Sequence, residues 1–150
     1  MGMKDSKEST KELFEFIRKN AEMGTVTLKK MSDILENADR SMADVITKQL
    51  TEYSRIFDAA GNKLRALGEE GENVSVFART AANAMLSVQS IADKSPSHLA
   101  EMVIIGSIRG VISCLRQIRL NQNADSDAVN LAYRLLCAEQ SNIDELKRYL

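Results

Sequence analysis

Apolar side chains recur every three or four residues along most of this chain, with polar and charged residues between them. That spacing places the apolar residues on one face of an α-helix. It predicts four long helices, at about residues 10–36, 40–67, 96–121 and 126–149. A weaker stripe predicts a fifth helix at about residues 74–92. The pattern therefore indicates an all-α fold.

The ends of the predicted helices carry start and stop signals. Ser9 followed by Glu12 is typical of a capping box, and the polar residues 1–8 before it are expected to form a disordered tail. Gly68 is expected just after the second long helix. Ser95 and Pro96 supply an N-cap and a first helical residue for the next one. We expect a single domain over residues 9–150.

The lengths of the predicted helices and connections indicate how the helices are arranged. Short turns join the first two long helices and also the last two, so each pair is expected to be an antiparallel hairpin about 40 Å long. The connection between the hairpins is long and mostly helical. Two hairpins joined by a helical crossover are the layout of a ferritin-like four-helix bundle. The helix at 96–121 is the most apolar, and we expect it to be the most buried.

Composition and charge narrow the classes of partner. The chain has 150 residues, 20 Lys and Arg against 21 Asp and Glu, and a net charge of −1. A near-neutral chain without a basic block is not typical of a nucleic-acid binder. We see neither a membrane-spanning run nor the apolar core of a signal peptide, so we expect a cytoplasmic protein with no membrane partner.

Two cysteines and two glycines carry weaker signals. Cys114 and Cys137 lie in apolar stretches, so we expect buried, reduced thiols; a redox pair is the alternative, although no CxxC is present. Gly106 and Gly110 are four residues apart, which favours a close helix crossing. The wide apolar arc around them favours a homodimer, because four helices have difficulty covering so much apolar surface.

Motifs for catalysis are not found in the sequence. There is no phosphate-binding glycine loop and no nucleophile motif, and His98 is the single histidine. His98 falls in the first turn of a predicted helix, where an exposed or capping role is common. We therefore expect a non-catalytic protein that needs no cofactor.

Each long predicted helix nevertheless carries a glutamate on or beside its apolar face: Glu22, Glu52, Glu101 and Glu139. Counting from the turns places three of them near the middle of the bundle and Glu101 about 9 Å from that level. Carboxylates gathered at one height require protons, cations or basic partners. Arg55, three residues after Glu52, is one candidate partner.

These carboxylates predict a candidate divalent-metal site, with Asn142 and His98 as further candidate ligands. Oxygen ligands suit Mg²⁺, Ca²⁺ or Mn²⁺. Di-iron proteins of this architecture use Glu-x-x-His on two helices, but Arg55 and Asn142 stand where the histidines would follow Glu52 and Glu139. The site is therefore expected to be degenerate. The alternative is that the glutamates simply border an aliphatic core.

Glu139 is the strongest single candidate, because it interrupts the apolar stripe of the last helix. We expect its side chain to be at least half buried beside Asn142 and to face Glu22 or Glu52 across the bundle. Burial raises the pKa of a carboxyl group, whereas a nearby cation lowers it.

Several short segments resemble an uncharacterised family of small ferritin-like helical proteins from anaerobic Gram-positive bacteria. The resemblance spans about residues 11–150 and rests on NAEMG at 20–24, SPSHLAEM at 95–102, IGS at 105–107 and EQSNIDELKRYL at 139–150. It implies a ferritin-like bundle and a cytoplasmic setting, and it implies no activity. Arg109 departs from the more apolar residue that the family pattern suggests.

Taken together, the sequence predicts a helical-bundle protein that acts through self-association or through binding another protein. The alternative function is a metal-binding ferritin-like protein with a degenerate carboxylate site between the long helices.

Overall fold

The computed structural model describes residues 4–69 and 90–150, and their regular structure is entirely helical. The helices are α1 (Ser6–Leu35), α2 (Arg40–Ala66), α4 (Pro96–Leu120) and α5 (Ser126–Leu146), followed by a short 3₁₀ helix at Lys147–Tyr149. This confirms the all-α prediction for the described part of the chain. The predicted helix at 74–92 falls almost wholly outside the described residues, and residues 90–92 are not helical.

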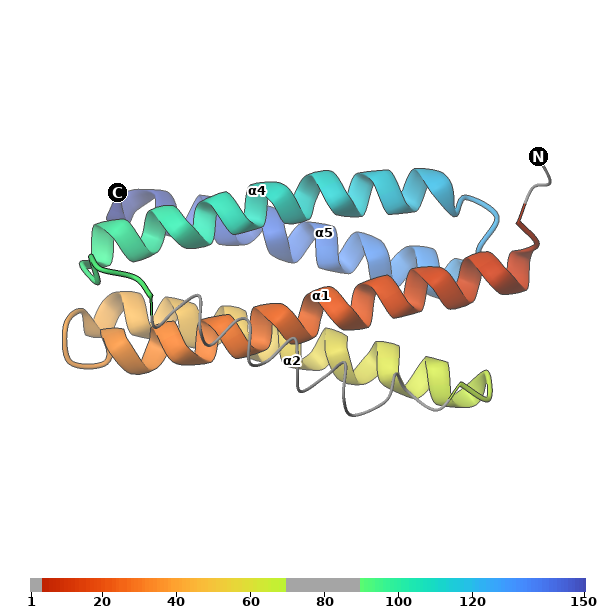
Figure 1. Ribbon diagram of the computed structural model, residues 1–150, viewed down its shortest axis with the longest axis horizontal. Coiled ribbons are helices and arrows are strands. Elements are labelled where there is room, and N and C mark those ends of the chain that lie inside the picture. The colour runs from red at the N-terminus through yellow and green to blue at the C-terminus, as the bar shows by residue number, and fades with distance from the viewer. Residues whose placement is uncertain (1–3, 70–89) are drawn as a thin grey trace.

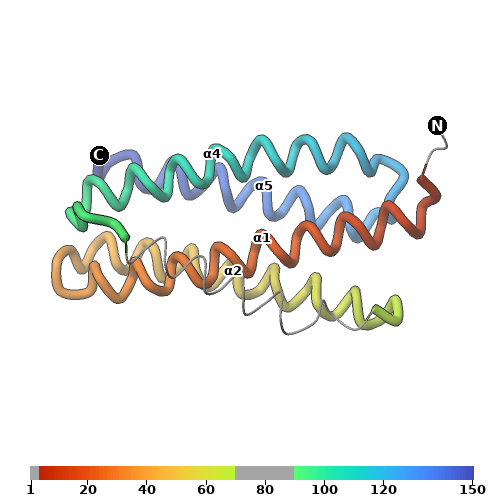
Figure 2. Tube along the Cα trace, in the orientation of Figure 1, coloured from red at the N-terminus to blue at the C-terminus, as the bar shows by residue number. Residues whose placement is uncertain are grey.

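The four long helices lie lengthwise beside one another (Figure 1). The chain runs along α1, turns, and returns along α2, and it repeats this course with α4 and α5. Figure 2 shows the two pairs stacked, with α1 next to both helices of the second pair. The turns at both ends are short because each helix stops at a cap.

The core between the pairs is aliphatic. The largest side chains with almost no solvent exposure come from all four long helices, although only Leu99 comes from α4: Leu13, Ile17, Met31, Leu35, Met42, Ile46, Ile56, Leu64, Leu99, Leu135 and Leu146. Removing a fully buried side chain of this kind from water contributes roughly 1.5–3 kcal/mol to stability. This shared core fixes the helices in place.

Two predicted helix boundaries are confirmed. Gly68 has a φ of +80°, in the left-handed region that glycine adopts without strain, and it follows Leu67, the C-cap of α2. At the start of α4, the Ser95 side chain accepts a hydrogen bond from the backbone of His98 at 3.3 Å, and Pro96 is the first helical residue.

The start of α1 differs from the prediction. The helix begins at Ser6, and the Asp5 side chain caps it by accepting a hydrogen bond from the backbone of Glu8 at 2.7 Å. The expected cap, Ser9, is buried within the helix. The predicted tail of residues 1–8 is therefore too long, because Asp5 lies three residues before Glu8 and competes successfully for the capping position.

Ser9 and Thr10 instead connect α1 to the turn between α4 and α5. The Ser9 hydroxyl donates a hydrogen bond to the side chain of Asn123 at 2.7 Å. The backbone N–H of Asp125 donates to the Thr10 hydroxyl at 2.8 Å, and the Asn123 amide donates to the carbonyl of Lys4 at 2.6 Å. These three bonds form a polar latch between the first turn of α1 and the α4–α5 turn.

The expectation that α4 is the most buried helix is wrong. Its buried residues are mostly small, namely Ala100, Ser107 and Cys114 together with Leu99 and Val103. Ile105, Ile108, Ile112 and Leu115 lie on the opposite face and are exposed, whereas Ile104, Val111 and Ile118 are partly buried against the core. A helix that is apolar almost all round has more aliphatic side chains than one buried face accommodates, and here the small residues occupy that face.

The two cysteines differ in solvent exposure. Cys114 is buried, as expected, whereas Cys137 is exposed, and both are free thiols. Cys137 lies two residues before Glu139 on α5, about 200° around the helix from this buried side chain, so it faces outward. The prediction of two buried thiols is thus half wrong.

Helix α4 has one further property. Among the described residues it is the single helix long and apolar enough to cross a membrane by length and composition, with a mean hydropathy of 1.5 in its most apolar window. Of that window, 28% is buried within the protein. This departs from the expectation that no segment approaches the character of a membrane span.

Candidate functional site

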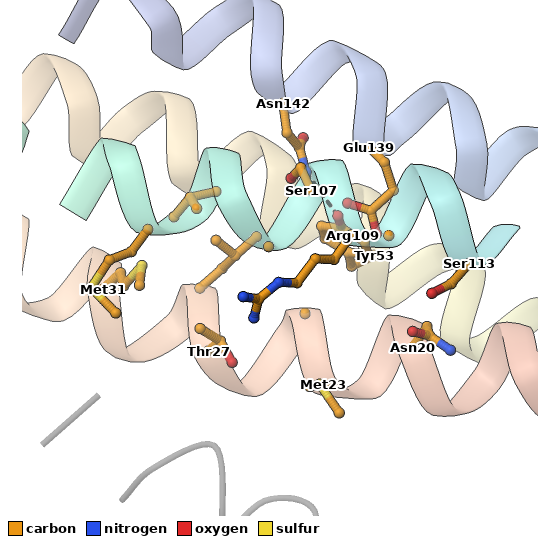
Figure 3. A pocket seen from close by; sticks show the side chains of 16 residues that line it. Asn20, Met23, Thr27, Met31, Tyr53, Ser107, Arg109, Ser113, Glu139 and Asn142 are labelled. Atoms are coloured by element: carbon orange, nitrogen blue, oxygen red, sulfur yellow. Dashed lines mark hydrogen bonds between the residues drawn. The ribbon is translucent and has the colours of Figure 1, made fainter. Parts of the chain in front are cut away.

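A cavity of about 340 Å³ lies between α1 and α4, and its floor is formed by α2 and α5. Figure 3 shows Tyr53, Ser107, Glu139 and Asn142 close together, from α2, α4 and α5. The α1 wall is formed by Asn20, Met23, Gly24, Thr27, Leu28 and Met31. The α4 wall is formed by Met102, Val103, Gly106, Ser107, Arg109, Gly110 and Ser113. The floor is formed by Tyr53, Glu139 and Asn142.

Glu139 supplies the carboxyl group of the floor. Its side chain is 7% exposed, which confirms the prediction that it is at least half buried. Burial raises the pKa of Glu139 to about 7, and the hydroxyls of Tyr53 and Ser107 counteract part of that rise as hydrogen-bond partners. No Lys or Arg of the described residues forms an ion pair with it.

Tyr53 and Asn142 hold the remainder of the floor. The Asn142 amide donates a hydrogen bond to the Tyr53 hydroxyl at 2.8 Å, and both side chains are buried (Figure 3). Burial and the neighbouring Glu139 carboxylate both raise the pKa of Tyr53, so its hydroxyl keeps its proton. The floor is thus a connected polar group of Asn142, Tyr53, Glu139 and Ser107 inside an aliphatic core.

Two glycines allow the helices to approach this group closely. A Cβ atom on Gly110 would lie 2.6 Å from the Glu139 carboxyl, and one on Gly24 would lie 3.1 Å from the Tyr53 ring. A Cβ on Gly106 would meet nothing within 4 Å. The close crossing predicted for the Gly106–Gly110 pair therefore belongs to Gly110, and Gly106 instead leaves space at the cavity wall.

Arg109 lies at the entrance of the cavity. It is exposed, and Figure 3 shows its side chain reaching from α4 toward Thr27 on α1. Three methionines line the cavity: Met31 is buried, Met102 is half-buried and Met23 is 44% exposed. Methionine is flexible and polarizable, so such walls accommodate apolar groups of different shapes.

Of the six residues predicted for a metal site, the structure brings Glu139 and Asn142 together in this cavity. Glu52 lies elsewhere, with its carboxylate accepting a hydrogen bond from Nε of Arg134 on α5 at 2.7 Å, so its partner is Arg134 rather than the expected Arg55. Glu22 is buried on α1 but does not line the cavity.

His98 and Glu101 pair with each other near the start of α4, with 3.4 Å between imidazole nitrogen and carboxylate oxygen. Both are substantially exposed, and neither lines the cavity. Within residues 4–69 and 90–150, no three His, Cys, Asp or Glu side chains gather in a way that could hold a metal ion. Glu139 therefore faces Tyr53 and Gly110 rather than the other predicted carboxylates.

The sequence interpretation missed Tyr53, Ser107 and Arg109 as site residues. Tyr53 stands at helical spacing among the apolar residues of α2, so the pattern alone does not distinguish it from a core residue. The sequence does contain a signal for Ser107. Glu139 lies as many residues after the α4–α5 turn as Ser107 lies before it, so the two residues are expected at the same level. The level of Glu139 therefore matches small residues of α4 and not Glu101.

Comparisons of the chain with protein-family models, with curated proteins and with solved structures give no match.

Proposed function

We propose that this protein is a non-catalytic bundle of ferritin-like layout that acts by forming a homodimer through the outer face of α4. The observation that carries this proposal is a row of four aliphatic side chains on that face, here called the outer stripe: Ile105, Ile108, Ile112 and Leu115. Their exposed fractions run from 42% to 51%. Such a row of large apolar groups on a soluble surface is typical of an interaction site.

The outer stripe continues along one line of the helix. Spacings of three and four residues keep its members within an arc of roughly 80°, and Glu101 and Arg119 extend the same line at its two ends. The opposite face of α4 packs on the core through Leu99, Val103 and the smaller residues Ala100, Ser107 and Cys114. The stripe is therefore free to meet a partner while the bundle stays intact.

The order of residues along this line favours a second copy of the chain as the partner. Position 110 is the midpoint of Ile105 and Leu115, and also of Ile108 and Ile112. Two α4 helices related by a two-fold axis at that level would therefore cross antiparallel with aliphatic opposite aliphatic. The same axis brings Glu101 of one copy opposite Arg119 of the other. A self-complementary patch of this kind is what a symmetric dimer requires.

Energetics indicate a modest affinity. Eight half-exposed side chains in the dimer each gain roughly 1 kcal/mol on burial, whereas association costs about 4–15 kcal/mol in lost rigid-body freedom. We therefore expect a reversible dimer whose population depends on concentration in the micromolar range or above.

A lipid bilayer is the main competitor for this surface. Arg109 flanks the outer stripe near the middle of α4, and Arg116 flanks it in the C-terminal half. A charged side chain buried in a lipid bilayer is energetically costly. The core-facing side of α4 is also occupied by the other helices. These features favour a protein surface as the partner. Metal binding is the weaker alternative, because only Glu139 and Asn142 of the candidate ligands share the cavity.

Sedimentation equilibrium over low-micromolar to near-millimolar protein tests the proposal. We expect the wild-type mass to rise from monomer to dimer. Ile108→Arg combined with Ile112→Arg should keep the protein monomeric. Leu120→Arg is the matched control, because Leu120 is 59% exposed but lies outside the stripe, and it should dimerise normally.

Charge exchange tests the antiparallel arrangement. Glu101→Arg and Arg119→Glu should each weaken the dimer, and the two changes together should restore it. A wild-type monomer at every concentration would overturn the proposal. If the wild-type protein sediments together with phosphatidylglycerol vesicles, and the combined Ile108→Arg and Ile112→Arg variant does not, a lipid bilayer is favoured as the partner instead.

A further inference from the structure

The cavity between α1 and α4 is independent of the outer stripe, and it has the features of a small-molecule site. Its volume of about 340 Å³ lies at the lower end of the range for ligand pockets. Methionine, leucine and valine side chains share the walls with glycines and with the polar residues Asn20, Thr27 and Ser113, whereas the carboxyl, phenol and amide groups of Glu139, Tyr53 and Asn142 lie together on the floor. A ligand that fits must be small, with an apolar body and a polar end that meets the floor.

The hydrogen bonds of the floor indicate which polar end is complementary. The Asn142 amide donates to the Tyr53 hydroxyl, and the Tyr53 and Ser107 hydroxyls are directed to the Glu139 carboxyl. The two hydroxyls and one N–H of the Asn142 amide are therefore already engaged. A carboxylate offers about four acceptor positions, so Glu139 retains capacity to accept further hydrogen bonds. A matching ligand must bring donors.

Charge leads to the same requirement. Glu139 is 7% exposed and has no ion-pair partner among the described residues, although a buried carboxylate is costly without one. The neighbouring protic groups stay neutral, because the pKa of Cys114 is raised to about 12 and that of Tyr53 is also raised. The α1 wall contributes neutral side chains only, and Arg109 lies at the entrance. The deep end of the cavity therefore lacks a positive charge.

We propose that this cavity binds a small alkylammonium ligand, with the ammonium group on Glu139 and the alkyl chain along Met23, Met31 and Met102. An ammonium group supplies three N–H donors and the missing positive charge together. The three methionines accept an unbranched chain without demanding one shape. Gly106 leaves the adjoining wall open, since a Cβ there would meet no atom within 4 Å.

Isothermal titration calorimetry with three matched probes tests this assignment. The probes are pentylammonium chloride, pentan-1-ol and sodium pentanoate, which share a chain and differ in the charge of the polar end. We expect one pentylammonium ion per chain, with an affinity at least tenfold higher than that of the alcohol and no measurable binding of pentanoate. Equal affinities for the three probes would overturn the proposal.

Two variants separate the charge from the cavity. Glu139→Gln keeps the size of the side chain and should reduce pentylammonium affinity at least tenfold, with a much smaller effect on pentan-1-ol, which carries no charge. Gly106→Leu fills the cavity from the wall, keeps Glu139, and should reduce the binding of both probes. Undiminished pentylammonium binding in either variant would show that the ligand sits elsewhere.

Methyl-labelled methionine locates the bound chain without relying on a variant. Pentylammonium should give NMR cross-peaks to the methyl groups of Met23, Met31 and Met102, and none to that of Met42, which lies in the core and does not line the cavity. Perturbation of the cavity methyls by MgCl₂ or MnCl₂ alone, without any by pentylammonium, would overturn the alkylammonium assignment in favour of a metal ion.

Discussion

The α1–α2 pair and helix α4 distribute their large side chains in opposite ways. In α1 and α2 the leucines and isoleucines at helical spacing point inward, as Ile17 and Ile56 do with 0% exposure. In α4 most of the buried residues are small, and Ile105, Ile108 and Ile112 point outward. The first arrangement serves stability, because it removes apolar surface from water within one chain. The second leaves such surface available, which is why we assign the contacts with partners to α4.

Matched truncations provide the strongest test of this contrast. Ile56→Ala leaves a cavity in the core and should lower the free energy of unfolding by about 2–5 kcal/mol. Ile112→Ala removes a side chain that is 49% exposed and should change it by no more than about 0.5 kcal/mol in the monomer. Urea denaturation of dilute protein measures both. Comparable losses would mean that α4 is covered within the monomer.

The pH dependence of stability sharpens the comparison at the floor of the cavity. Because the pKa of Glu139 is raised to about 7 in the folded chain, the native state holds its proton more tightly than the unfolded state. This contribution to stability is complete below about pH 4.3, the pKa of an unperturbed glutamate, and is lost as pH rises to about 7.

The loss should amount to about 4 kcal/mol at most. Glu139→Gln should abolish this part of the pH profile, and thermal or urea unfolding from pH 4 to 8 in both proteins would reveal it. A difference between the two proteins that stays constant over this range would contradict the burial of an isolated carboxyl group.

Two alanine substitutions on α4 should have opposite signs. Gly110→Ala forces a methyl group to within 2.6 Å of the Glu139 carboxyl and should destabilise the fold by about 1–3 kcal/mol. Gly106→Ala meets no neighbouring atom and should stabilise it by up to about 1 kcal/mol, since alanine favours the helix. Urea denaturation of the two variants compares them directly, and equal effects would argue against the close α4–α5 contact.

The smallest effect is expected on the surface, at the ion pair of Glu52 and Arg134. Both side chains are partly exposed, at 37% and 45%, so solvent screens the pair. A double-mutant cycle with Glu52→Gln and Arg134→Gln should give a coupling of about 0.2–1 kcal/mol that decreases with added salt. A coupling of several kcal/mol would indicate that Glu52 belongs to a buried site after all.

Helical periodicity was sufficient to predict the described helices and most of their ends. It predicted the buried position of Glu139 because this residue continues a line of leucines on α5. It failed on α4, because large aliphatic residues surround that helix and periodicity cannot say which of them face inward. The decisive residues there were small ones, Ser107, Gly110 and Cys114, whose contribution is close approach rather than hydrophobicity.

The candidate site was predicted only in part for a related reason. Glu139 and Asn142 share one helix, so their spacing placed them together reliably. Tyr53 and Arg109 come from other helices, and their contribution depends on helix rotation and on level. A shift of one residue in rotation, about 100°, moves a side chain from the cavity to the surface.

The latch between α1 and the α4–α5 turn has a consequence for the order in which the chain is made. Ser9 and Thr10 leave the ribosome early, whereas their partners Asn123 and Asp125 are more than a hundred residues away in the sequence. At a synthesis rate of about 5–20 residues per second, several seconds pass before the hydrogen-bond partners of the first turn of α1 have been made. During that interval the α1–α2 hairpin lacks these hydrogen bonds, so the N-terminal turn of α1 is among the last of the described parts to be fixed in place.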